Sequence, residues 1–256
     1  MQRCIALSAA LGGVGLGTLS LALAEALSAR GLRVALIDAF VDAPFADLAF
    51  GFEEEVLYTF SDVVEGTAPQ RAAFEVKKDL FVFPSSVGSN LDGDLAAAVL
   101  AVQKALSPDV LLIASPISLL HRFFSVLDTA ILVSSTEERA RRASEAASAI
   151  LADGPVKSSY LLLNKSAAYK DELAEEPPLL TMVDSIGLSL LGVCPREYQK
   201  DALLPFGKVA HSNFKKAVAN VAARLLGERV PLLNGVRLDG FSRRHFIERT
   251  EKGTLP

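Results

Sequence analysis

The apolar residues of this chain gather in short uninterrupted runs, and these runs alternate with segments of helical spacing. The runs are 3–8, 33–38, 80–83, 109–114, 130–134, 160–164 and 190–194. A strand with one solvent-exposed face alternates apolar and polar residues, whereas continuous runs are typical of a parallel sheet covered on both faces. We therefore expect an α/β fold with a doubly wound, mostly parallel sheet and helices on both faces.

Helices are predicted between these runs from apolar residues that recur every three or four positions. The faces with this spacing are 16–27, 95–106, 140–150 and 214–225. Residues 166–180 are charged and contain two adjacent prolines, so we expect a surface excursion there. Core periodicity stops near position 231. We expect one α/β domain over 1–230 and a basic-leaning tail over 231–256.

Composition excludes several classes of protein. Half of the 256 residues are hydrophobic and 22% are charged, which suits a large core and argues against intrinsic disorder. A formal net charge of −4 argues against a protein that binds nucleic acid through overall charge. Cys4 and Cys194 lie inside apolar runs and are interpreted as buried thiols in a reducing compartment. No apolar run reaches the roughly 18 residues of a membrane span. These features predict a cytoplasmic protein.

A glycine-rich loop joins the first predicted strand to the first predicted helix. Residues 12–17 contain four glycines in six positions. Glycines let backbone N–H groups point at an anion, and a helix N-terminus adds positive potential. In a working phosphate loop a Lys follows the last loop glycine, and the Ser or Thr after it holds Mg²⁺. Here these positions are Leu16 and Gly17, and Thr18 comes one place late. A tight strand-to-helix turn without a ligand is the alternative interpretation.

The chain resembles the MinD/ParA family of P-loop ATPases, whose loop reads Lys-Gly-Gly-Val-Gly-Lys-Thr-Thr. Residues 11–18 read Leu-Gly-Gly-Val-Gly-Leu-Gly-Thr. The resemblance extends over nearly the whole chain, with further similar segments at 33–38, 56–66, 80–86, 113–116, 164–165, 192–197, 222–228 and 240–246. It implies the doubly wound P-loop fold. It also implies a vestigial nucleotide site at Gly12, Gly13, Val14, Gly15, Leu16, Gly17, Thr18, Asn164 and Lys165.

Five positions that carry ATP hydrolysis in the family are replaced here. They are Leu11 and Leu16 for two lysines, Gly17 for the metal-binding Thr, Phe40 for a switch Asp, and Ala114 for the Walker B Asp. Phosphoryl transfer depends on electrostatic stabilisation, and each such group typically contributes on the order of 3 kcal/mol. The resemblance with these losses predicts a pseudo-ATPase without catalytic residues. We expect any ATP or ADP binding to be weak and no Mg²⁺ to be held.

The expected role is that of a regulator, scaffold or partner in division-site placement or another positioning process. The resemblance implies a protein partner, either a positioning factor or a homologous ATPase. It also implies a membrane-targeting helix, here within 236–249, which would place the protein at the inner face of the cell membrane. No nucleic acid is expected as a partner.

Two alternatives remain open at this point. An active or nucleotide-binding ATPase would need substitute residues such as Asp42, Asp47 or Lys165. A Rossmann-type dinucleotide-binding protein would use Gly13-Val14-Gly15, with Asp38 about 20 residues further on.

Overall fold

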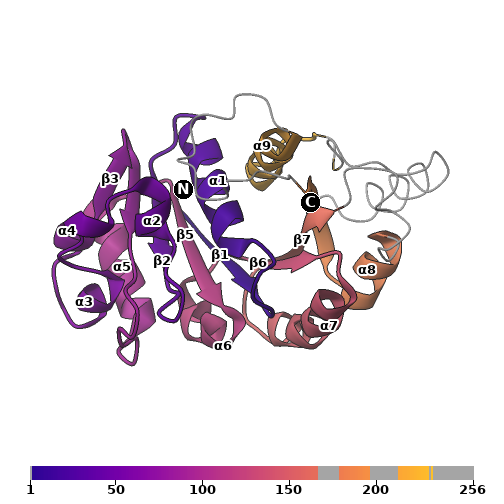
Figure 1. Ribbon diagram of the computed structural model, residues 1–256, viewed down its shortest axis with the longest axis horizontal. Coiled ribbons are helices and arrows are strands. Elements are labelled where there is room, and N and C mark those ends of the chain that lie inside the picture. Colours follow the sequence, from indigo (N-terminus) through magenta and orange to yellow (C-terminus); the bar gives the residue numbers. More distant parts are fainter. Residues whose placement is uncertain (1, 167–178, 197–212, 231, 233–256) are drawn as a thin grey trace.

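An eight-stranded sheet forms the centre of the protein in a computed structural model that describes residues 2–166, 179–196, 213–230 and 232 (Figure 1). The strands are β1 (Arg3–Ala9), β2 (Val34–Asp38), β3 (Phe74–Lys77), β4 (Leu80–Phe83), β5 (Val110–Pro116), β6 (Thr129–Ser135), β7 (Ser158–Ser166) and β8 (Ser189–Pro195). Their order is β3-β4-β2-β5-β1-β6-β7-β8. All neighbours are parallel except β3, which pairs antiparallel with β4. The predicted doubly wound, mostly parallel sheet is confirmed.

Helices connect the strands and cover both faces of the sheet. They are α1 (Leu16–Ser28), α2 (Ala46–Phe50), α3 (Phe60–Val64), α4 (Pro69–Ala72), α5 (Leu95–Leu106), α6 (Ile117–Leu120), α7 (Glu138–Ala152), α8 (Leu179–Ile186) and α9 (Asn213–Leu225), with 3₁₀ turns η1 (Glu53–Glu55) and η2 (His121–Val126). Helices α1 and α9 pack together on one face, and α5, α6, α7 and α8 cover the other (Figure 1).

Two hydrophobic clusters, one on each face, hold the sheet between the helices. The cluster on the α1 face includes Leu7, Leu23 and Val221, and the opposite cluster includes Phe83, Val99 and Phe123. Full burial of a side chain of this kind contributes about 1.5–3 kcal/mol, so the continuous apolar runs are stabilised on both sides. Both cysteines are buried free thiols, and burial raises the pKa of each to about 12.

The order of the strands places the glycine loop at the switch point of the sheet. β1 lies between β5 and β6, and β2 lies on the β5 side. In register, Leu7 pairs with Ala114 of β5 and with Ile131 of β6. The chain therefore leaves β1 where the connections diverge to opposite sides. In open α/β sheets this is the position at the carboxyl ends of strands where ligands bind.

The sequence did not predict every element. β3 is a four-residue edge strand, and α2, α3, α4 and α8 are short. The surface excursion predicted for 166–180 is wrong at both ends. Ser166 ends β7, and Leu179 begins α8 with its side chain buried in the core. Residues 167–178 lie outside the described part of the chain.

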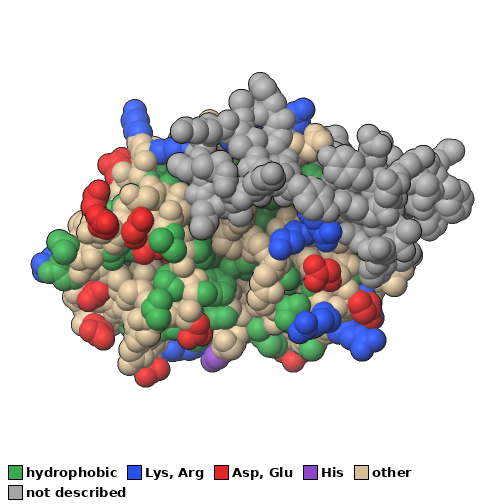
Figure 2. Space-filling model, viewed as in Figure 1, with side chains coloured by type: hydrophobic (Ala, Val, Ile, Leu, Met, Phe, Trp, Pro, Cys, Tyr) green, Lys and Arg blue, Asp and Glu red, His purple; other side chains and the backbone are tan. Residues whose placement is uncertain are grey.

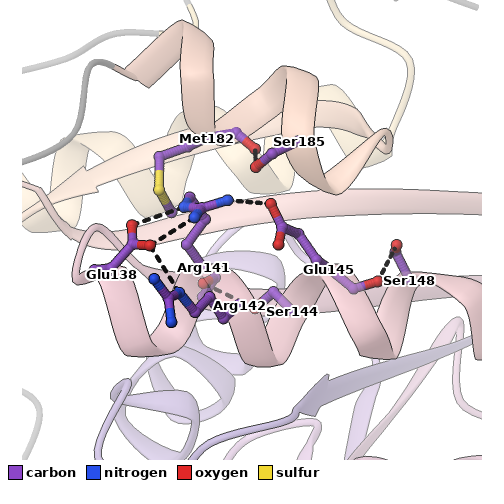
Figure 3. A network of polar contacts seen from close by, with 9 residues as sticks. Glu138, Arg141, Arg142, Ser144, Glu145, Ser148, Met182 and Ser185 are labelled. Carbon is purple, nitrogen blue, oxygen red and sulfur yellow. Dashed lines mark hydrogen bonds and ion pairs between the residues drawn. The ribbon is translucent and has the colours of Figure 1, made fainter.

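The charged run at the start of α7 forms an ion-pair network on that helix. Arg141 donates to both carboxylate oxygens of Glu138 at 2.6 and 2.8 Å and also pairs with Glu145. Arg142 donates to Glu138 at 2.9 Å. Figure 3 shows this network beside Met182 and Ser185 of α8. The side-chain bonds to Arg141 and Arg142 lower the pKa of Glu138 to about 2.

The tail predicted for 231–256 and its membrane helix at 236–249 lie outside the described residues, apart from Leu232. Leu232 is buried in the cluster on the α5 face. The domain boundary at 230 therefore stays a prediction. Among the residues that the structure describes, no helix is long and apolar enough to cross a membrane.

The contact between β8 and α9 generates a test of the fold. Gly192 lies under α9, and a Cβ added there would come 2.7 Å from the Cγ2 atom of Val221. We expect Gly192→Ala to lower the free energy of unfolding in urea by about 1–3 kcal/mol through overpacking. In a Val221→Ala background the same change should cost little. An equal cost in both backgrounds would contradict this packing.

Candidate functional site: a vestigial phosphate loop

The glycine loop follows β1 from Ala10 and leads directly into α1 at Leu16. Gly13 and Gly15 have φ of 80° and 84°, a left-handed conformation that favours glycine. Gly15 is the N-cap of α1, and its carbonyl accepts the Leu19 N–H at 3.0 Å. Gly12 and Gly13 are exposed. The loop therefore keeps the left-handed turns and the helix N-terminus of a phosphate cradle.

Asn164 and Lys165, at the end of β7, lie against this loop. The Asn164 amide donates to the Val14 carbonyl at 2.9 Å, and the Lys165 ammonium donates to the Gly13 carbonyl at 2.5 Å. A Cβ added at Gly15 would lie only 2.5 Å from the Asn164 amide nitrogen. The fold thus brings together all nine residues predicted for the vestigial site. Whether they bind a nucleotide stays a prediction.

The residues at the family's charged positions lie in the hydrophobic core or pack against it. Leu16 and Ala114 are buried in the cluster on the α1 face, and Leu11 and Phe40 pack against that cluster. These four residues offer no charge and no hydroxyl. An ammonium or carboxylate at these positions would need a partner, because burial of an unpaired charge is costly.

The fifth replaced position, Gly17, contacts an aromatic side chain that the sequence analysis missed. A Cβ added at Gly17 would lie 2.9 Å from the Cγ atom of Phe45 and 3.1 Å from each Cδ atom. The rings of Phe40 and Phe45 meet edge to face, with 6.0 Å between their centroids. In the view of Figure 2, hydrophobic side chains gather over the region where β5 ends in Figure 1.

Asp38, at the end of β2, holds the segment that carries these two rings. Its carboxylate is fully buried and accepts the N–H groups of Phe40 at 3.0 Å, Phe45 at 2.9 Å and Ala46 at 3.1 Å. Burial raises the pKa of Asp38 to about 7. The three hydrogen bonds from backbone N–H groups act in the opposite direction and lower this pKa. Nearby Asp47 adds a small further increase. Asp38 is therefore a structural acceptor for the loop between β2 and α2.

The residues present do not fit Mg²⁺, which prefers carboxylate and other oxygen ligands. Ala114 replaces the carboxylate, Gly17 has no side chain, and Thr18 is exposed one position further along α1. Of the substitute residues named above, Asp42 is exposed and Asp47 accepts the N–H of Leu48 at 2.8 Å. In the described part of the chain, no group of three or more His, Cys, Asp or Glu could hold a metal ion.

Comparison with known proteins gives a consistent set of relatives. The septum site-determining protein MinD of Thermotoga maritima is 27% identical over 251 residues, covering 91% of this chain and 92% of that protein. MinD of Escherichia coli K12 is 28% identical over 282 residues, covering 100% of this chain and 98% of that protein. This similarity over nearly the full length supports the assignment of the chain to the MinD/ParA family. No family model matches the chain.

Solved structures of the MinD/ParA family agree with this fold. The MinC:MinD cell division complex of Aquifex aeolicus superposes with a TM-score of 0.79 at 22% identity, over 91% of this chain and 98% of that chain. MinD of Pyrococcus horikoshii with Mg-ADP gives a TM-score of 0.68 at 21% identity, over 88% and 96%. The similarity to MinD proteins gives no support to the Rossmann-type alternative. Both Asp38 oxygens, which that alternative needs for a ribose, already accept backbone N–H groups.

The buried acceptor generates a stability prediction. We expect Asp38→Ala to lower the free energy of unfolding by about 2–4 kcal/mol, because three backbone N–H groups lose their acceptor. Asp47→Ala is the matched control on the same segment, and we expect it to cost less than about 1 kcal/mol. Urea denaturation measures both. Equal costs for the two variants would contradict the role given to Asp38.

The raised pKa of Asp38 generates a pH prediction. The unfolded carboxyl titrates near 3.9 and the folded one at about 7, so between these values the folded protein holds the extra proton. The free energy of unfolding should therefore fall as pH rises from about 4 to 7, by on the order of 3–4 kcal/mol from this group.

Urea denaturation midpoints of the wild type and of two variants, measured from about pH 4 to 7, test the pH prediction. Asp38→Asn should lack the Asp38 contribution to the slope, and Asp47→Asn should keep it. Parallel pH curves for the wild type and Asp38→Asn would contradict the assignment.

Proposed function

We propose that this chain is a MinD/ParA-like pseudo-ATPase that acts as a regulator, scaffold or partner in division-site placement or another intracellular positioning process. One observation carries the proposal. Four of the five residues at the family's catalytic positions, namely Leu11, Leu16, Phe40 and Ala114, lie inside or against a single hydrophobic cluster. An apolar site of this kind provides no stabilisation for the charge that develops in phosphoryl transfer.

The role in positioning is proposed from the relatives. The proteins that match nearly the full length of this chain are named septum site-determining proteins. A protein partner is proposed in the same way, because one structural neighbour is a MinC:MinD complex. Because the residues that serve ATP hydrolysis in the family are replaced here, we expect such a partner to bind equally with and without ATP. Affinity capture in the two conditions tests this, and partner capture that requires ATP would refute it.

Membrane attachment through 236–249, at the inner face of the cell membrane, is proposed from the sequence of that segment alone. Arg243, Arg244 and Arg249 lie among apolar residues there, a composition that suits an anionic lipid surface. Co-sedimentation with anionic vesicles tests it. Binding should fall when Arg243 and Arg244 are changed to Glu, and an unchanged bound fraction would count against the segment.

One observation favours the second candidate, an ATPase with a substitute cation. The Lys165 ammonium reaches the Gly13 carbonyl, so a positive charge does lie at the loop. A single ammonium replaces neither the metal nor the carboxylate, and for this reason we rank hydrolysis second. Lys165 is nevertheless a residue with which a remaining phosphate affinity could be tested.

Phosphate release from Mg-ATP tests the two candidates against each other. For the pseudo-ATPase we expect release by the purified wild type to equal a blank without protein. The control is Lys165→Ala, which should behave identically. Mg²⁺-dependent release that disappears in Lys165→Ala would overturn the proposal and place the ATPase first.

A further inference from the structure

We propose that Phe45 is a built-in plug of the phosphate loop, held over Gly17 by Asp38, so that the segment 39–46 keeps one conformation without any nucleotide. This inference rests on the proposed function, since it concerns the same vestigial site. It adds that the Phe45 ring closes this site and that Asp38 fixes the segment beside it.

The first support is the contact between the plug and the loop. Three ring atoms of Phe45 lie within 3.1 Å of the position that a Cβ at residue 17 would occupy. Real Cβ atoms essentially never come within 3.0 Å of another atom, and the Cγ atom of Phe45 lies at 2.9 Å, so a side chain at position 17 would force this ring to move. The glycine at the metal-binding position is therefore required by the packing of Phe45.

The second support is the number of bonds that fix the segment 39–46. Asp38 accepts N–H groups near both ends of it, from Phe40 and from Phe45 and Ala46. The Ala39 N–H donates to the Ala114 carbonyl at 2.9 Å.

In its middle, the segment is bonded to a neighbouring loop. The carbonyl of Val41 accepts the Gly88 N–H at 3.0 Å. The beginning, middle and end of the segment are thus bonded within the protein itself.

These bonds determine whether the segment 39–46 can switch its conformation with a nucleotide. In nucleotide switches a segment is ordered by contacts with the terminal phosphate and its Mg²⁺, and it is released on hydrolysis. A ligand shifts an equilibrium only through contacts that differ between two states. Here Asp38 and Phe45 make the ordering contacts themselves. The surface that this segment presents to a partner is therefore present constitutively.

A double-mutant cycle between Gly17 and Phe45 tests the plug. In the wild type, Gly17→Ala should lower the melting temperature by about 4–8 °C, because the new methyl group collides with the ring. In a Phe45→Ala background the same change should be neutral or stabilising, because position 17 lies in helix α1 and alanine has a higher helix propensity than glycine. Phe50→Ala, a half-buried Phe on α2, is the matched background in which the full loss should persist.

A second comparison keeps the test decisive if Phe45→Ala does not fold. Gly12→Ala alters the same loop at a position where a Cβ meets nothing within 4 Å. We expect Gly12→Ala to leave the melting temperature within about 1 °C while Gly17→Ala lowers it.

Two outcomes would overturn the plug. One is an equal loss from Gly17→Ala with and without Phe45, and the other is an equal loss from Gly12→Ala and Gly17→Ala. Neither would affect the proposed function, which depends on the absence of ATP turnover by the wild type.

Discussion

The site depends on the hydrogen bonds that the buried carboxylate of Asp38 accepts. It ends β2 next to Ala114 of β5, and it accepts three N–H groups from the loop after β2 and from the first residue of α2. Buried polar groups of this kind are tolerated only when they are hydrogen-bonded. The bonds position Phe40 and Phe45, and Phe45 in turn lies against Gly17. One acceptor thereby positions both rings beside Gly17.

The apolar residues at and around the replaced positions pack together. Leu16 and Ala114 belong to the same cluster, and Phe45 packs where glycine leaves room. Restoring a single charge, such as a lysine at position 16, would place an unpaired cation in this cluster at high cost. These positions are therefore physically interdependent.

The features that the sequence predicts well are those that repeat along the chain. Continuous apolar runs give the seven parallel strands, and the glycines at 12–17 give the left-handed turns before α1. The edge strand β3 was not predicted because its four residues alternate in burial, so they do not form one of the continuous apolar runs from which the other strands were predicted. Helix α8 escapes because Leu179 directly follows two prolines and a charged run.

The role of Phe45 has no signal in the local sequence. It follows a proline in a loop, and only the tertiary fold brings its ring onto Gly17, 28 positions earlier. The likeness of Asp38 to the dinucleotide fingerprint points to a ligand, whereas its neighbours in space are backbone N–H groups. Contacts between distant segments therefore decide the chemistry of this site, and periodicity alone does not reveal them.

The most direct test of a closed, nucleotide-independent site is amide hydrogen exchange in the segments 11–18 and 38–46, with and without millimolar Mg-ATP. We expect slow exchange at the Phe40, Phe45 and Ala46 amides bonded to Asp38 and no change when nucleotide is added. Protection that appears in both segments only with Mg-ATP would contradict it, because it would show a loop that binds nucleotide and responds to it.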